Sequence, residues 1–262
     1  MAAKKLWISA LCKDEARIAK LNSALRKYGF DATGHVWLDE ADKLAWRVAY
    51  DELQKRKTDY WLILADQESL AKPGIRYALN VMTFALRRDR QDVLPIIVLG
   101  TESMRTQLPV ALQSVKIIDE NAAGWEAKIV ASTLKPPIPD HLPYRIDIYG
   151  DDKIGQWFEI GPTEGAWSGV IFGAAGDGVS LTFHAVGPAG KLPEKTILEY
   201  AREGMKIEAG GKAYTAGSVR NHIDTDTSYF VRVKGLPDSL LVMPDESGAD
   251  TDAPEAYLVN LG

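Results

Sequence analysis

The sequence predicts an α/β flavodoxin-like domain followed by an all-β sandwich or barrel domain. Composition divides the chain: residues 1–140 hold 5 glycines and the remainder holds 17. Charge divides it too, with 21 Lys and Arg against 18 Asp and Glu before that point and 10 against 18 after it. The third observation is a change in the spacing of apolar residues from a helical to a two-residue period. Four prolines within residues 135–143 predict a stiff linker, so the expected domains are 1–134 and 144–262.

Short apolar runs separated by amphipathic stretches define the elements of the first domain. The expected strands are 4–11, 30–38, 59–65, 92–99 and 114–118. The expected helices are 14–28, 41–57, 73–88 and 122–134, with the polar residues 66–69 as a loop. Strands that alternate with helices of this length predict a parallel sheet covered on both faces.

Beyond the linker, apolar and polar residues alternate as in half-buried strands. The expected strands are 144–149, 155–160, 167–172, 178–184, 195–200, 204–208, 212–216, 228–234, 239–243 and 256–261. Gly, Pro, Asn and Asp separate them, which is typical of a sandwich or barrel. Residues 173–178 (GAAGDG) look superficially like a dinucleotide-binding loop. They lie between two expected strands with no helix after them, so we expect a hairpin there.

Several segments of the first domain, in this order, resemble a TIR (Toll/interleukin-1 receptor) domain over residues 4 to about 134. LWISALCKDEARIAKLNSALRKYGF looks like the opening strand, polar loop and first helix of that family. HVWLDE, followed by Trp46, resembles the second strand and its loop. YWLILADQESL and VLPIIV resemble the third and fourth strands. The resemblance implies a signalling role through self-association or binding to a partner protein.

Enzymatic TIR domains share a glutamate, on the helix after the third strand, that cleaves the nicotinamide–ribose bond of NAD. In this sequence the matching position falls near Arg76 or Tyr77, and neither can act as a carboxylate. Asp66 and Glu68 are the nearest acids and therefore the candidate catalytic residues. The resemblance implies the fold without the usual hydrolase chemistry, unless one of these two acids substitutes. It requires no cofactor, and NAD is the ligand or substrate that it suggests.

Ligands of open α/β sheets bind at the carboxyl ends of the strands. The ligand-binding candidates chosen from this region and from the resemblance are Ser9, Cys12, Lys13, Asp39, Trp46 and Tyr77. A nearby helix start and Lys13 are expected to lower the pKa of the Cys12 thiol. A nucleophilic thiol also needs a base, however, and no histidine lies near Cys12 in the sequence, so a passive role is favoured.

Composition argues against several classes of function. A formal net charge of −5 gives no basic field for nucleic acid, and no apolar run is long enough to cross a membrane. One cysteine forms no internal disulfide, and the four histidines lack metal-ligand spacing, so no metal site is expected. The first residues read as a strand and not as a signal peptide, so we expect a cytoplasmic protein. A phosphorelay receiver would need an acidic pair directly after the first strand, where this chain has Ser-Ala-Leu-Cys.

Three functions from different classes remain open. The first is a noncatalytic TIR-like interaction protein. The second is an NAD-hydrolysing or nucleotide-binding enzyme with a variant acidic site at Asp66 or Glu68. The third is a sensor of small molecules or carbohydrates through the β domain, where Trp157 and Trp167 would stack a ligand if they were exposed together.

Overall fold

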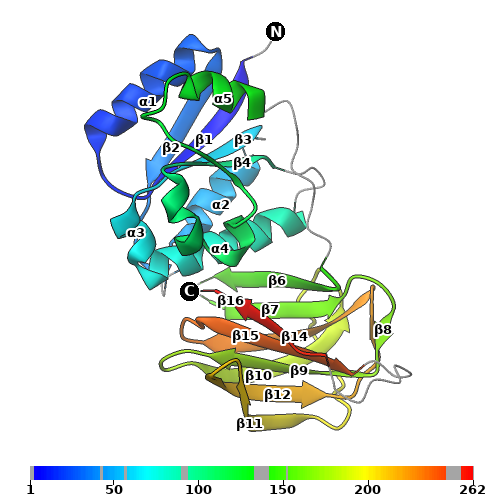
Figure 1. Cartoon of the computed structure of the whole chain (residues 1–262). Coiled ribbons are helices and arrows are strands. Elements are labelled where there is room, and N and C mark those ends of the chain that lie inside the picture. The colour runs from blue at the N-terminus through cyan, green and yellow to red at the C-terminus, as the bar shows by residue number, and fades with distance from the viewer. Residues whose placement is uncertain are drawn as a thin grey trace. The chain divides into compact units, whose positions relative to one another are not determined.

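The protein consists of two compact units, Met1–Pro139 and Asp140–Gly262 (Figure 1). The computed structural model describes residues 3–41, 44–55, 58–89, 94–132, 142–151, 153–245 and 255–261. Most of the proline-rich stretch 135–143 lies outside these described residues. Each unit has its own core and is described by itself.

The first unit is built on a parallel five-stranded sheet in the order β2-β1-β3-β4-β5. Its strands are β1 (Lys4–Ala10), β2 (Phe30–Val36), β3 (Tyr60–Leu64), β4 (Ile96–Leu99) and β5 (Lys116–Ile118). This is the strand order of flavodoxin-like folds, as the sequence predicts. Every side chain of the central strand β3 is buried, because helices cover both faces of the sheet.

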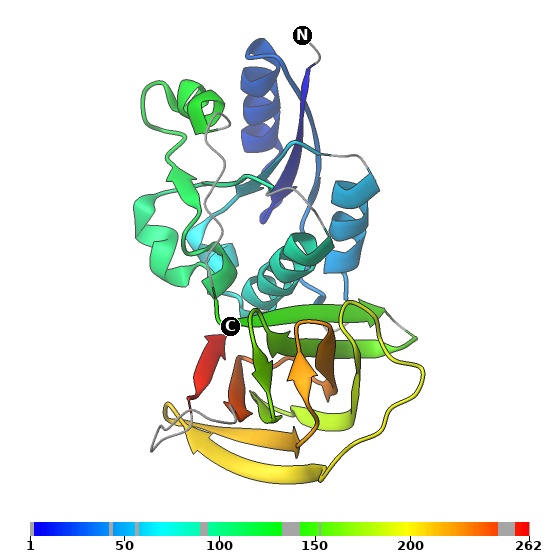
Figure 2. The same ribbon diagram turned by 90° about the vertical axis from the view of Figure 1, so that its right-hand side faces the viewer.

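Helices cover the two faces of this sheet. They are α1 (Glu15–Lys27), α2 (Trp46–Lys55), α3 (Gln67–Ala71), α4 (Pro73–Asp89) and α5 (Trp125–Ser132), with two 3₁₀ turns, η2 (Glu102–Gln107) and η3 (Val110–Leu112). Leu21 and Leu25 of α1 share one apolar cluster with Ile129 of α5, so these helices lie on the same face. The helices α2 and α4 contact each other, and Figure 2 shows α2 across the sheet from α1.

Two elements of this unit differ from the sequence prediction. Residues 66–69 were expected to form a loop, but α3 begins at Gln67 because Asp66 caps its first turn. The expected helix 41–57 begins later, at Trp46. Leu44 adopts a φ of 55°, in the left-handed region, and this geometry is incompatible with continuing an α-helix through that residue.

The second unit contains two antiparallel sheets, as expected for an all-β region. One has the order β10-β14-β7-β6, the other has the order β11-β12-β9-β15-β16, and β13 pairs with β8. The strands are β6 (Tyr144–Asp151), β7 (Gly155–Pro162), β8 (Ala166–Trp167), β9 (Gly169–Ala175), β10 (Ser180–Pro188), β11 (Arg202–Ala209), β12 (Lys212–Val219), β13 (Ile223–Asp224), β14 (Thr227–Lys234), β15 (Ser239–Asp245) and β16 (Tyr257–Asn260). The rings of Phe158 on β7 and Phe172 on β9 lie 5.8 Å apart, so these sheet faces pack together.

Three predictions for this unit were wrong. Residues 173–178 do not form a hairpin, because they lead from β9 in one sheet to β10 in the other. Residues 195–200 form no strand, and Asn221 instead holds this segment through Ile197 O and Glu199 N. The expected strand 167–172 is divided into β8 and β9. Trp167 is buried, so it is not exposed together with Trp157 as a stacking platform would require.

A buried carboxylate joins several strands of the second unit. Glu159 is fully buried on β7 and accepts hydrogen bonds from Tyr149 Oη (2.5 Å), Gly190 N (2.8 Å) and Ser228 Oγ (2.6 Å). Arg145 donates to the same Ser228 hydroxyl over 2.8 Å and also to backbone carbonyls, including that of Thr227. A Cβ on Gly161 would lie 2.5 Å from Arg145 Nη2, so glycine leaves the guanidinium room to cross β7.

Candidate functional site

The carboxyl ends of β1 and β3 are where this fold is expected to place a functional site. The chain passes from β1 to the edge strand β2 and then returns to β3 on the other side of β1. Ligands of doubly wound sheets bind where the strand order reverses in this way. The ends of the two strands lead directly into Cys12 and Asp66.

Asp66 is held by the first turn of α3. Its Oδ1 accepts the backbone N–H of Ser69 over 2.8 Å, and its Oδ2 lies 2.8 Å from Ser69 Oγ. Burial acts to raise the pKa of Asp66, but the Ser69 hydrogen bonds, the Cys12 thiol and the charge of Arg17 outweigh it and hold the pKa below its usual range. Asp66 is therefore an ionised helix cap with both of its oxygens engaged.

Cys12 contacts this carboxylate directly. Burial raises the pKa of its thiol, and the hydrogen bond and negative charge of Asp66 raise it further, against the weaker opposing effect of Arg17. The sequence predicted that the helix start and Lys13 would lower this pKa. The prediction was wrong, because burial and the Asp66 carboxylate raise the pKa instead. The thiol stays protonated at neutral pH, a form in which a cysteine is a poor nucleophile.

Arg17 and Glu120 complete the cluster, and sequence reasoning missed both. Arg17 Nε donates to Glu120 Oε1 over 2.6 Å, and Arg17 Nη2 donates to Ala65 O over 2.9 Å. The two side chains are only 20% and 15% exposed, so the ion pair is shielded from solvent. Glu120 could have been identified from its position just after β5, because ligands of parallel sheets bind at the carboxyl ends of the strands.

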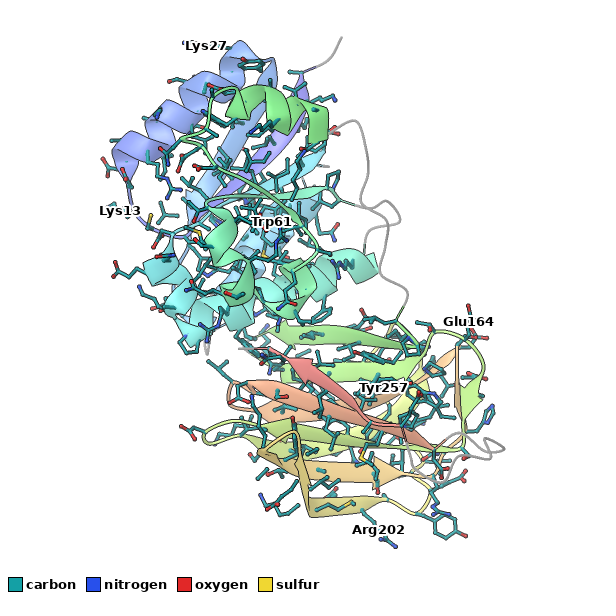
Figure 3. The ribbon with its side chains drawn as sticks, viewed as in Figure 1. Lys13, Lys27, Trp61, Glu164, Arg202 and Tyr257 are labelled. Carbon is teal, nitrogen blue, oxygen red and sulfur yellow. The ribbon has the colours of Figure 1, made fainter. Side chains whose placement is uncertain are left out.

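Three of the candidate ligand-binding residues lie in the interior. Ser9 is fully buried within β1 and accepts a 2.9 Å hydrogen bond from Trp61 Nε1 (Trp61 is labelled in the interior in Figure 3). Trp46 on α2 and Tyr77 on α4 are 1% and 2% exposed. Their side chains help to form the core, and none of the three faces solvent at the strand ends.

The other candidates are at the surface. Lys13 and Glu68 are exposed, and Figure 3 shows Lys13 at the periphery of its unit. Asp39 is exposed as well and lies beside the start of α4, where a Cβ on Gly74 would meet its Oδ1 at 2.6 Å. Negative charge at a helix start is favourable, so Asp39 has a structural role at this position. Of the residues that the sequence analysis proposed for the site, only Cys12 and Asp66 are brought together.

Arg76 lies on α4 and its side chain reaches back to the end of α3. Its Nη1 donates to Leu70 O over 2.8 Å and to Ala71 O over 3.0 Å. These carbonyls end α3, so the guanidinium caps that helix. The short helix α3 is thus capped by Asp66 at its N-terminus and by the Arg76 guanidinium at its C-terminus.

The cluster of Cys12, Arg17, Asp66, Ser69 and Glu120 is satisfied by its own members. The carboxylates of Asp66 and Glu120 each accept a hydrogen bond from another side chain of the cluster, and Arg17 donates to Glu120 and to the backbone carbonyl of Ala65. The thiol is protonated. Among these five side chains no base or nucleophile is poised for chemistry at neutral pH. The arrangement instead ties together the segments that follow β1, β3 and β5.

Replacement of Asp66 by Ala is expected to destabilise the α/β unit by about 1–2 kcal/mol, the usual effect of losing a helix N-cap. Glu68→Ala, an exposed acid two residues away, is the matched control and is expected to change stability by less than about 0.5 kcal/mol. Urea denaturation followed by tryptophan fluorescence measures both. Equal effects of the two substitutions would contradict the capping role.

No protein-family model matches the chain, and no curated protein matches it either.

Within the described residues, no helix is long and apolar enough to span a membrane. In that same part of the chain, His, Cys, Asp and Glu do not gather in threes as metal ligands.

Proposed function

We propose that this chain is a noncatalytic, TIR-like interaction protein whose α/β unit acts by self-association. The observation that carries the proposal is the engagement of the acids at the strand ends. Asp66 is a helix cap, and Glu120 is paired with Arg17. Cleavage of a bond to ribose needs a carboxylate that faces the sugar and stabilises its developing positive charge. Arg76 and Tyr77, near the corresponding position, supply none.

The edge strand β2 is the surface that supports assembly. It pairs with β1 on one side only, and an edge strand offers unpaired backbone groups to another chain. Large apolar side chains are exposed in β2 and in the residues that flank it: Tyr28 (50%), Val36 (38%) and Leu38 (64%). Within the described α/β unit, the other exposed large apolar side chains are Val48 (68%) on α2 and Val110 (40%) on η3. A second copy of the chain, related by a two-fold axis, would cover this surface with its own β2.

Light scattering after gel filtration tests the assembly over a wide range of protein concentration. We expect the molar mass to rise toward a dimer with concentration, and Leu38→Asp to shift the protein back to the monomer. Val110→Asp places the same charge on η3, away from β2, and is expected to leave assembly unchanged. A protein that is monomeric at every concentration, or a Leu38→Asp variant that assembles like the parent chain, would contradict self-association through this edge.

A further inference from the structure

A cleft of about 560 Å³ lies on the sheet that contains β11, β12, β9 and β15. This volume is in the range of sites for small organic molecules. The cleft is on the sheet face opposite Phe172, which packs toward the other sheet. It belongs wholly to the second unit, so it is independent of the assembly proposed for the first.

The strand register shows how the floor of the cleft is built. Arg202, Ser218, Ile171 and Met243 form one row across the four strands. Asp245 lies opposite Gly169 in the next row, and Arg220 follows directly after β12 at the same level. Gly169 has no side chain, and a Cβ there would come within 2.7 Å of Val219 O and 3.2 Å of Arg220 Cα. Glycine at this position therefore lets the backbone of residues 219 and 220 lie close against β9.

A β-bulge places Arg202 in the cleft. The register of β11 against β12 shifts between Arg202, opposite Ser218, and Met205, opposite Ala216. In a regular strand residues 202 and 205 would point to opposite faces, but the extra residue puts both on one face. Gly204 has a φ of 67°, which suits the bulge. The bulge thus adds a cation and a thioether to the same cleft.

The two arginines form a cationic end. Arg202 lies opposite Ser218, and Arg220 follows two residues after Ser218, just past the end of β12. Diagonal positions of this kind place the two Cα atoms roughly 7–8 Å apart. Both are exposed, and among the described residues neither guanidinium forms an ion pair. Figure 3 shows Arg202 at the outer margin of its unit. Two guanidinium groups at this spacing can converge on one phosphate, which they recognise through paired N–H donors.

The opposite end of the cleft carries an acceptor. Asp245 on β15 is two strands away from Arg220, roughly 10 Å at the usual strand spacing. The floor between these ends is apolar, formed by Ile171 and Met243. A ligand that satisfies both ends must therefore carry an anion at one end and an N–H or O–H donor at the other, joined by an apolar or planar body.

Tyr200 supplies a rim on which a planar ring can stack. Its side chain is 81% exposed, and its φ of 48° is uncommon for a bulky residue. The segment is held in place by Asn221 and by the Arg220 N–H, which donates to Glu199 O over 2.8 Å. Strained backbone of this kind concentrates at ligand sites, and an exposed aromatic ring is a stacking surface.

We propose that this cleft binds a small phosphate-bearing molecule with a planar, amino-substituted ring, of the size of a nucleoside monophosphate. The phosphate lies between Arg202 and Arg220, and the ring covers Ile171 and Met243 beside Tyr200. The amino group donates to the Asp245 carboxylate. A neutral sugar would leave both guanidinium groups without an anion, so the charge of the cleft favours the phosphate ligand.

Isothermal titration calorimetry of the full chain with AMP, CMP, UMP, adenosine and inorganic phosphate tests the proposal. We expect AMP or CMP to bind saturably. UMP is expected to bind more weakly, because the single ring N–H that it offers Asp245 is flanked by two carbonyl oxygens that the carboxylate repels. Adenosine or phosphate alone is expected to bind at least about tenfold more weakly than the tightest nucleotide. Arg202→Gln and Arg220→Gln are each expected to weaken nucleotide binding by about tenfold or more. Arg232→Gln removes an exposed arginine from the other sheet and is expected to change nothing.

Three results would overturn the proposal. They are the absence of saturable binding for every nucleotide, nucleotide affinity that survives both arginine substitutions, and inorganic phosphate that binds as tightly as the nucleotides. Asp245→Asn gives an independent check, because it is expected to reduce the preference for AMP or CMP over UMP. Circular dichroism of each variant shows that it is folded, which these exposed positions favour.

Discussion

Glu159→Ala is expected to destabilise the β unit by about 3–5 kcal/mol, the effect of removing one partner from a buried charged network. The substitution leaves Tyr149 Oη, Gly190 N and Ser228 Oγ without their common acceptor. It also removes the nearby negative charge that faces Arg145. Domains are stable by only about 5–15 kcal/mol, so the β unit is expected to lose a large part of its free energy of unfolding.

The matched control is Glu194→Ala, because the Glu194 side chain is 88% exposed and lies 4.0 Å from Lys191. An exposed pair of this kind contributes at most about 1 kcal/mol. Guanidinium chloride denaturation of both variants, followed by circular dichroism, compares the two sites. If Glu159→Ala cost no more than Glu194→Ala, the network would not be what fixes β6, β7 and β14 together.

Lowering the pH from 6.5 to 4 is expected to reduce the stability of the α/β unit by up to about 3 kcal/mol through His35 alone. His35 lies between the rings of Trp7 and Trp37, at centroid distances of 5.6 and 5.5 Å. Burial lowers its pKa to about 4. In the unfolded chain the pKa returns to about 6.5, so the unfolded state takes up the proton first as the pH falls. The contribution of His35 to the free energy of unfolding is therefore fully present above pH 6.5 and declines between pH 6.5 and 4. Below pH 4 this residue causes no further loss of stability.

His35→Gln removes the titration and is expected to flatten the dependence of unfolding free energy on pH in this window. His222→Gln is the control, because the His222 side chain is 72% exposed and belongs to the other unit. Urea denaturation at a series of pH values, monitored by tryptophan fluorescence, gives the slopes. A His35→Gln variant with the same slope as the parent chain would show that other groups govern the acid response.

The fold could be predicted because it follows from local patterns. Buried runs such as 60–64 and the spacing of helix apolar residues set the order of elements, and that order leaves few topologies open. The details that failed depend on long-range pairing. Residues 173–178 have the composition of a hairpin turn, yet β9 and β10 pair with other strands in different sheets. The bulge before Met205 also leaves no reliable mark in the sequence beyond a glycine.

The candidate site was only partly predictable, for a related reason. Cys12 and Asp66 follow adjacent strands, so their meeting could be inferred from strand order. The pairing of Arg17 with Glu120 joins residues 103 positions apart and depends on the segment after β5 reaching the start of α1. Ser9 lies inside the expected strand 4–11 and inside β1, where its side chain accepts a hydrogen bond from Trp61. Both faces of this sheet are covered, so a side chain within a central strand becomes part of the core whichever face it points to.

Nicotinamide release from NAD tests most directly whether the acids at the strand ends are structural. Purified full-length protein is incubated with NAD at concentrations that permit assembly, alongside Asp66→Asn and Glu68→Gln. We expect no release above the spontaneous background from any of the three. Release by the parent chain that is lost in either variant would contradict the claim and make this protein an enzyme with a displaced catalytic acid.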